Sequence, residues 1–354
     1  MTTIAAGVYD VGCGAAKTAA AVGADHGWLA GPFVSAKDRE GVRNMKGSLS
    51  RDFPHQIADW EDLARAMDFF RCLELGKQVS GKAEEWVFRG VGDAADDTPL
   101  NTTLDQVAND FGIKGEGIAR IEIDQLLEFM RRYHLYAVES PPAKGDTLDW
   151  LALMRHYGAP SRLLDFTYSF LVAAYFALGR KEKNPRGQPT IWAISKTWLS
   201  REVPTIVARG NNLAQPFKRY LKYRDGNGFR EVFFKGRPQI VYPVSPFRLN
   251  QRLTIQQGLF LCPGDVTKTF DENLKSMPHH EENVMRIPIE FGARTDLLMA
   301  IYRANMNRAT LFPGLDGFAL SLWTRAPSFQ RLRTMEDIGA RLKVNLDIDA
   351  LREY

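Results

Sequence analysis

The order in which two hydrophobic periodicities occur along the 354-residue chain constrains its fold most strongly. From Asp59, apolar residues recur every three or four positions, which is the spacing of an amphipathic helix, and Asp59 itself is a suitable N-terminal cap. Short apolar runs typical of strands cluster in the centre and late part of the chain. This order predicts an α+β fold, with mixed or antiparallel central sheets and helices packed around them.

Individual elements follow from the same patterns and from the glycines and prolines that interrupt them. An acidic loop is expected at 93–101. Helices are expected at 59–76, 120–137, 146–156, 170–178 and 295–304. Strands are expected at 86–90, 190–195, 238–243, 253–262 and 284–289.

The domain organisation is simple. Residues 1–55 show neither periodicity and are interpreted as an N-terminal extension, with one domain over 56–325 and a C-terminal extension over 326–354. Three scattered cysteines have no metal-binding spacing, which argues against disulfides and structural zinc. No apolar run approaches the roughly 18 residues that cross a bilayer, and the start lacks the basic flank of a signal peptide. A cytoplasmic protein without membrane contact is expected.

Charge is concentrated in one stretch. The net charge of +4 is too small to imply a polyanionic partner. Between Arg201 and Arg252, however, eleven Lys or Arg residues stand against three Asp or Glu, and they are interleaved with Phe217, Tyr220, Tyr223, Phe229, Phe233 and Phe234. Such a stretch can grip a phosphodiester and stack bases, which makes nucleic acid a candidate partner. The alternative is a solvated surface over a partly buried sheet.

Two local features carry chemistry. Arg89 ends a short strand and is followed by Gly90, an arrangement that suits a phosphate or a ribose-bearing ligand. The alternative is a structural pair between Arg89 and Asp165. No metal site is expected, because Asp316 stands alone and the four side chains of 279–282 are adjacent and cannot converge on one ion.

The second feature is the segment 156–169. Gly158 and Pro160 force a turn and two leucines anchor it, so that His156, Arg162, Asp165 and Thr167 are expected to project from a rigid scaffold. His156 is a candidate acid or base. The alternative is structural, with Arg162 and Asp165 paired across the turn and His156 capping a helix.

Five landmarks occur in an order that resembles the FRG-domain family. They extend over roughly residues 56–320, and Arg155 and Ser161 stand where the family usually has Gln and Thr. The landmarks are W-V-F-R-G at 86–90, H-Y-G-A-P-S-R-L-L-D-F-T at 156–167, A-Y-F-A at 174–177, Q-G-L-F at 257–260 and L-F-P-G-L-D-G at 311–317.

By motif order, the chain also resembles the arginine–serine–glutamate class of ADP-ribosyltransferases. This resemblance implies that Arg89, with Gly90, binds NAD and that Thr167 and Ser169 position the nicotinamide ribose. Arg162 completes the cofactor-binding set that we predict. The strand that carries the catalytic glutamate in that class has Gln256 and Gln257 here.

The catalytic prediction therefore comprises Arg89, His156, Asp165 and Gln257. An amide orients a ribose hydroxyl but supplies no negative charge. Either another carboxylate serves, Glu290 or Asp165, or the transfer is altered, or the site only binds.

Three functions remain open on the sequence. The first is an NAD-dependent ADP-ribosyltransferase or NAD glycohydrolase that modifies nucleic acid or protein, acting as a toxin or in phage defence, with an antitoxin or defence partner. The second is a nuclease-like enzyme that needs no NAD and uses His156 with Arg162 and Arg89. The third is a nucleotide-binding or nucleic-acid-binding module without catalysis.

Overall fold

The computed structural model describes residues 53–75, 83–94, 98–137, 140–179, 187–209 and 212–329. Most of the predicted N-terminal extension, 1–55, and most of the C-terminal one, 326–354, lie outside these residues. Six strands form one sheet in the order β4-β5-β2-β1-β3-β6, and every pairing between them is antiparallel. The strands are β1 (Trp86–Ala94), β2 (Leu164–Thr167), β3 (Gln188–Ser195), β4 (Val241–Val244), β5 (Gly258–Pro263) and β6 (Val284–Pro288).

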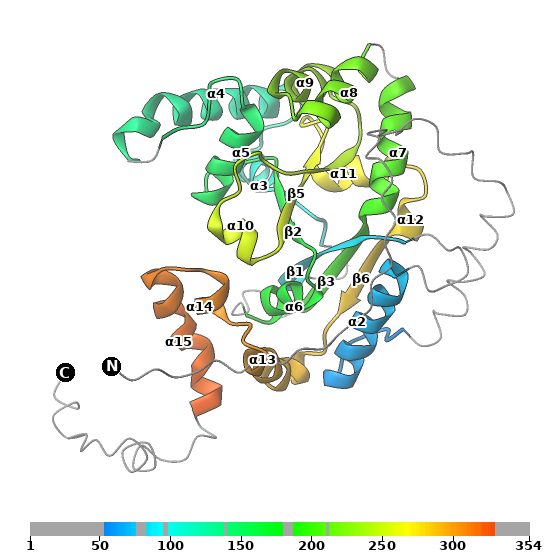
Figure 1. Ribbon diagram of the computed structural model, residues 1–354, viewed down its shortest axis with the longest axis vertical. Helices are drawn as coiled ribbons and strands as arrows, with labels where there is room; N and C mark the ends of the chain where they lie inside the picture. Colours follow the sequence, from blue (N-terminus) through cyan, green and yellow to red (C-terminus); the bar gives the residue numbers. More distant parts are fainter. Residues whose placement is uncertain are drawn as a thin grey trace, which may run out of the picture.

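Helices surround this sheet, which confirms the predicted α+β class (Figure 1). Short 3-10 turns at Tyr133–Leu135 and Phe291–Ala293 and a π-helical turn at Glu231–Gly236 extend three of the helical segments. The first seven helices are α2 (Trp60–Glu74), α3 (Thr103–Asp110), α4 (Glu116–Arg132), α5 (Thr147–His156), α6 (Phe170–Leu178), α7 (Lys196–Arg209) and α8 (Ala214–Tyr223). The others are α9 (Gly226–Arg230), α10 (Gln251–Ile255), α11 (Phe270–Lys275), α12 (His280–Asn283), α13 (Arg294–Arg303), α14 (Arg308–Leu311) and α15 (Leu315–Phe329).

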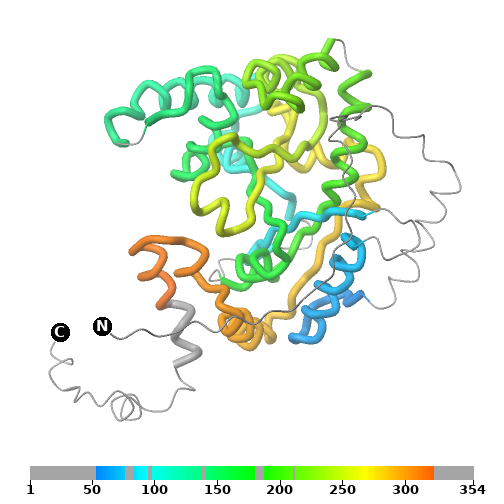
Figure 2. The backbone as a smooth tube through the Cα atoms, in the orientation of Figure 1, coloured from blue at the N-terminus to red at the C-terminus, as the bar shows by residue number. Residues whose placement is uncertain are grey.

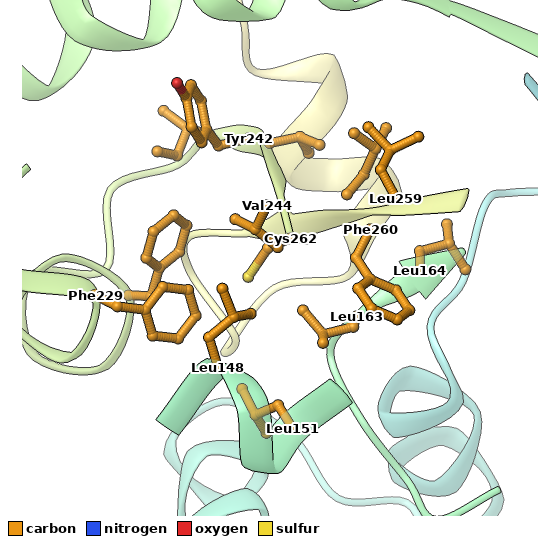
Figure 3. Close-up of a cluster of buried hydrophobic side chains, with 14 of the residues drawn as sticks. Leu148, Leu151, Leu163, Leu164, Phe229, Tyr242, Val244, Leu259, Phe260 and Cys262 are labelled. Carbon is orange, nitrogen blue, oxygen red and sulfur yellow. The ribbon is translucent and has the colours of Figure 1, made fainter. Parts of the chain in front are cut away.

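The two faces of the sheet bury separate hydrophobic clusters. Alternation along β1 sends Val87 to one cluster and its neighbours Trp86 and Phe88 to the other. The first cluster joins the sheet to α5, α7, α8 and α9, and Figure 3 shows Leu151 and Phe229 converging there on the strand residue Cys262. The second joins it to α2, α6 and α13. Helices therefore pack on both faces of the sheet.

Early and late parts of the chain meet at one edge of the sheet. Ile57 forms a parallel bridge with Ile289, which directly follows β6, and donates its N–H to the Pro288 oxygen at 2.9 Å. Figure 2 shows the early segment in blue beside this late segment in orange. This edge of the sheet can therefore form only after two segments that are separated by more than half of the chain have come together.

Several predicted elements occur where we expected them. Helix α2 is capped by Asp59, whose side chain accepts from the Asp62 N–H. Helices α5, α6 and α13 and strands β1, β3, β4 and β6 also match their predicted segments, although β1 runs on into the expected acidic loop as far as Ala94. Helix α4 begins and ends earlier than the predicted segment 120–137, and its last turn is a 3-10 turn.

The strand predicted at 253–262 is wrong in its first half. Asn250 caps the short helix α10, and its side-chain oxygen accepts from the Leu253 N–H at 2.7 Å. Gln257 then adopts a left-handed conformation with φ of 47°, and β5 starts only at Gly258. The local cap and turn override the apolar run, with the consequence that Arg252 and Gln256 lie on a helical turn instead of a strand.

No helix within the described ranges is both long enough and apolar enough to span a membrane.

Candidate functional site

A pocket opens where β1 and β2 separate. These two strands pair at one position, Phe88 with Thr167. Beyond it their chains diverge, and the pocket of about 120 Å³ occupies the gap. It is lined by Phe88, Arg89, Gly90, Val91, Arg155, Asp165, Phe166, Thr167, Phe176, Arg252, Leu253, Gln256 and Gly258. Four of the residues predicted from the sequence, Arg89, Gly90, Asp165 and Thr167, are thus brought to one place.

Arg89 bridges the two diverging strands. Its Nη1 donates to the backbone oxygen of Asp165 at 2.7 Å, and the same nitrogen lies 3.9 Å from Asp165 Oδ2. The guanidinium thereby supplies a hydrogen-bond donor to the backbone oxygen of Asp165, at a point where β1 and β2 no longer pair with each other. The sequence left open a phosphate role and a pair with Asp165 for this arginine. In the structure Arg89 pairs with Asp165, and the Arg89 side chain also lines the pocket.

Asp165 is held by a second arginine. Nε of Arg155 donates to Asp165 Oδ2 at 2.7 Å, and Nη2 of Arg155 donates to the same oxygen. Burial by itself would raise the pKa of Asp165, but the guanidinium groups of Arg155 and Arg89 outweigh it and hold the pKa below its ordinary value. Asp165 is therefore a fixed carboxylate at neutral pH.

Thr167 ties β2 to α10 and to α6. Its hydroxyl donates to the backbone oxygen of Gln256 at 2.7 Å and accepts from the Ser169 N–H at 3.0 Å. The Ser169 hydroxyl caps α6 by accepting from the Val172 N–H at 3.3 Å. The two hydroxyls predicted to position a ribose are thus engaged in shaping the turn, and Thr167 alone of the two lines the pocket.

Gly90 is required by packing. A Cβ at this position would lie 1.9 Å from the Ala173 oxygen and 2.5 Å from the Ala177 nitrogen, both on α6. The backbone of β1 therefore lies directly against α6. This close approach holds Arg89 beside Phe176, which α6 contributes to the pocket.

The outer wall of the pocket comes from late in the chain. Arg252 on α10 stacks its guanidinium on the ring of Phe312, with Cζ 4.4 Å from the centroid. Arg308 on α14 does the same at 4.4 Å. The Phe312 ring also meets Phe176 edge-on at 5.9 Å, and Gln256 Nε2 donates to the Leu311 oxygen at 2.9 Å. Helices α6, α10 and α14 are thereby joined around this aromatic residue.

Arg162 does not reach the pocket. It is 1% exposed and forms a two-pronged ion pair with Glu122, which is 2% exposed. Its Nη1 also donates to the Phe233 oxygen at 2.7 Å, and its Cζ lies 4.4 Å from the Phe234 ring centroid. Arg162 therefore connects α4 to the π-helical turn inside the protein, and the alternative pair of Arg162 with Asp165 is not formed.

The other predicted residues lie outside the lining of the pocket. His156 is the last residue of α5, with its ring 5.0 Å from that of Tyr157. Gln257 is exposed, and its backbone oxygen accepts from the Tyr168 N–H at 2.9 Å. Glu290 follows β6, which is separated from β1 by β3. Of the carboxylates weighed from the sequence, Asp165 alone lines this pocket.

The basic and aromatic stretch 201–252 forms helices, a π-helical turn and β4. Phe217, Tyr220, Phe229 and Phe233 are buried in the first cluster, so these aromatic residues serve the core and cannot stack on bases. Tyr223 is 66% exposed. Neither of the sequence interpretations anticipated helices here.

Metal-ligating and thiol groups give no further site. The described residues contain no group of three or more His, Cys, Asp or Glu side chains able to hold a metal ion. Cys262 is fully buried, which raises the pKa of its thiol to about 12. Cys72 is half-buried and free, and Cys13 lies outside the described residues.

Sequence reasoning missed three pocket residues. Arg155 was noted as a departure from the FRG pattern, and that departure next to His156 was the available signal. Arg252 and Gln256 were assigned to a strand or to a charged surface. No local pattern marks them, because α10 reaches the pocket only through the pairing of β5 with β2.

Comparison with known proteins gives one match. Neither a curated protein nor a solved structure matches the chain. The family model of the FRG domain matches residues 84–186. This segment supplies Arg89, Arg155, Asp165 and Thr167, whereas α10 and Phe312 lie beyond it. The pocket thus combines residues inside the matched segment with residues that follow it in the sequence. The chain contains an FRG domain.

Proposed function

We propose that the pocket between β1 and β2 binds NAD and that the protein transfers ADP-ribose from NAD to a macromolecule. The observation that carries this proposal is the joining of Arg89 and Asp165 across the diverging strands, in a pocket that Thr167 also lines. A cation for phosphate, a carboxylate for a developing positive charge and a hydroxyl beside them meet the chemical needs of such a transfer.

Phosphate recognition follows from the charge of the pocket. Arg89, Arg155 and Arg252 line it, with Asp165 as the acidic residue among its lining side chains. Arginine presents a planar fork of N–H donors that matches phosphate oxygens. The excess positive charge therefore favours an anionic ligand over a neutral or cationic one.

Asp165 takes the place of the glutamate that the late strand lacks. In the transfer, the bond between C1′ of the ribose and the nicotinamide nitrogen breaks, and the electron pair leaves with nicotinamide. The C1′ atom becomes cationic in the transition state, and a carboxylate nearby stabilises it. An acceptor oxygen or nitrogen then bonds to C1′ and loses its proton. The lowered pKa of Asp165 keeps the required negative charge at neutral pH.

The size of the pocket sets which part of NAD it holds. At about 120 Å³ it is smaller than the roughly 300–1,000 Å³ of a site that encloses a whole small molecule. We assign to it a phosphate and the adjoining ribose, with the rest of the dinucleotide at its mouth. The acceptor then approaches from solvent.

For the acceptor, nucleic acid is the first class to test. On α8, Phe217 and Tyr220 face the core, whereas Lys218, Arg219 and Lys222 are exposed beside Tyr223. A basic face of this kind attracts a phosphodiester backbone. Protein is the second class. Modification of either inside a cell would arrest growth, as expected of a toxin or a phage-defence effector.

The test measures NAD binding and nicotinamide release by the purified protein, alone and with RNA, DNA or a protein extract. Arg89→Ala should abolish binding. Asp165→Asn should retain detectable binding and lose release. Arg230→Ala, at an exposed arginine of α9, is the matched control and should behave as wild type.

Two results would count against the proposal. Wild-type protein that binds NAD but releases no nicotinamide with any acceptor would leave a binding module. Cleavage of nucleic acid without NAD, with no NAD binding, would favour the nuclease-like alternative, for which the position of His156 outside the pocket gives no support.

A further inference from the structure

We propose that Arg252 and Arg308, stacked on Phe312, form a second phosphate subsite that makes the pocket selective for a diphosphate. This inference rests on the proposed function in one respect: NAD carries two adjacent phosphates, and the subsite states which residues bind the second one. The ligand class is a nucleoside diphosphate or a dinucleotide joined through a diphosphate.

The first argument is the geometry of the two guanidinium groups. Both Cζ atoms lie 4.4 Å from the centroid of the same phenylalanine ring. Stacking fixes the plane of a guanidinium and leaves its N–H edge available to an oxyanion. Phe312 therefore holds two guanidinium groups against one ring, and one of them, Arg252, lines the pocket.

The side chains of Arg252 and Arg308 differ in their close contacts from those of Arg89 and Arg155. Arg89 and Arg155 both contact Asp165. Within the described part of the chain, neither Arg252 nor Arg308 donates a hydrogen bond or forms an ion pair at contact distance. The Nε of Arg308 is buried without any hydrogen-bond partner. A buried donor without a partner destabilises the protein, and a bound oxyanion that accepts from this donor removes the cost.

The third argument is electrostatic. Burial lowers the pKa of Arg252, and the like charges of Arg155 and Arg308 add to this effect, whereas Asp165 opposes it. Asp165, which Arg155 already contacts, is the one carboxylate among the residues that line the pocket, whereas Arg155 and Arg308 both repel Arg252. A dianionic group between Arg252 and Arg308 would convert this repulsion into two charge-assisted contacts.

The subsite adjoins the pocket through two residues. Arg252 itself lines the pocket with Arg89 and Arg155. Phe312 contacts Phe176, which lines it as well. One phosphate beside Arg89 and a second beside Arg252 and Arg308 would thus occupy neighbouring positions, as the two phosphates of a diphosphate do.

The experiment compares ADP with AMP by isothermal titration calorimetry, because these ligands differ by one phosphate. Wild-type protein should bind ADP at least about tenfold more tightly than AMP, which is the contribution of one good charge-assisted contact. In the double variant Arg252→Gln, Arg308→Gln this ratio should fall to about one. Arg230→Gln is the matched control and should keep the wild-type ratio.

A second variant keeps the test valid if the glutamines disturb folding. Arg252→Lys, Arg308→Lys retains both charges but loses the planar fork, and it should give an intermediate ratio. Equal wild-type affinities for ADP and AMP, no binding of either, or an equal loss for both ligands in the double variant would overturn the inference.

The two proposals fail separately. Nicotinamide release by a wild-type protein that does not distinguish ADP from AMP would refute the diphosphate subsite alone. Selectivity for ADP that the double variant loses, without any nicotinamide release, would refute the ADP-ribosyl transfer alone.

Discussion

Arg155 donates two hydrogen bonds to a single oxygen of Asp165, from Nε at 2.7 Å and from Nη2. Arg155 stands where FRG domains usually have glutamine, so this fork is a feature of the present chain. The fork restricts rotation of the carboxylate, because both donors of Arg155 contact Oδ2. The link between Arg155 and Asp165 thus sets the orientation of the carboxylate in the pocket.

Replacing Arg155 by the usual glutamine tests this link. We expect Arg155→Gln to lower the free energy of unfolding by about 1 kcal/mol, because the charge-assisted hydrogen bonds are lost while Asp165 stays 39% exposed and partly hydrated. Urea denaturation at pH 7 measures the change. Arg71→Gln removes a similar but exposed pair with Asp68 and should cost less than about 0.5 kcal/mol. Equal effects of the two substitutions would show that the fork adds nothing.

The pH dependence of stability reports on Asp165. Its pKa is lower in the folded protein, so its stabilising effect is complete above the unfolded value of about 4 and is lost as the pH falls through the folded value. The difference in unfolding free energy between wild type and Asp165→Asn should therefore be constant near neutral pH and decrease below about pH 4. Denaturation series from pH 7 to pH 3 measure it. A difference independent of pH would contradict the lowered pKa.

The buried pair of Arg162 and Glu122 predicts a large effect away from the pocket. Glu122→Gln leaves the Arg162 charge buried without its counter-ion and should destabilise the protein by about 3–5 kcal/mol. Replacing both residues, as Glu122→Leu with Arg162→Met, should recover much of this loss. Thermal and urea unfolding of the three proteins provide the comparison.

A matched control for that pair is Glu116→Gln, whose partner is Arg237 at the surface. Glu116 is 69% exposed, so the substitution should change stability by less than about 1 kcal/mol. Folded protein carrying Arg162→Met and Glu122→Leu should also bind the pocket ligand as wild type does. Loss of binding with the fold intact would restore Arg162 to the binding set.

Gly90 should not accept a larger residue. Gly90→Ala places a Cβ 1.9 Å from the Ala173 oxygen, so β1 and α6 must move apart. We expect a loss of about 2 kcal/mol or more in unfolding free energy. A Cβ at Gly292 meets nothing within 4 Å, so Gly292→Ala should be neutral or slightly stabilising. Similar melting temperatures for the two variants would contradict the close packing on Gly90.

Elements with strong local signals could be predicted from the sequence. The alanine-rich composition of α6 and the N-terminal cap of α2 depend on residues that are adjacent in the sequence, and both helices were predicted at the correct positions. The helical segment after Lys196 was not anticipated, because its charged and aromatic composition resembles a surface. Only tertiary packing shows that Phe217 and Phe229 are part of the core.

The sequence identified the segments that contribute residues to the site, but it did not predict the contacts between their side chains. Arg89 and Asp165 lie on separate strands, and their proximity follows from the single pairing of Phe88 with Thr167. Arg162 belongs to the same motif as Asp165, yet it turns into the core because Glu122 on α4 provides a buried partner. Sequence spacing specifies neither which side chain finds a partner nor which helix supplies it.

The residues that line the pocket are far apart in the sequence, which has a consequence for the growing chain during synthesis. Its lining residues come from β1, α5, β2, α6, α10 and β5, and Phe312 packs on two of them, Arg252 and Phe176. A ribosome releases the chain from the N-terminus, so the matched segment 84–186 leaves the ribosome long before Arg252 and Phe312 do. A growing chain therefore carries the family motifs without a finished pocket. The pocket can therefore take its final form only after Arg252 and Phe312 have also been synthesised.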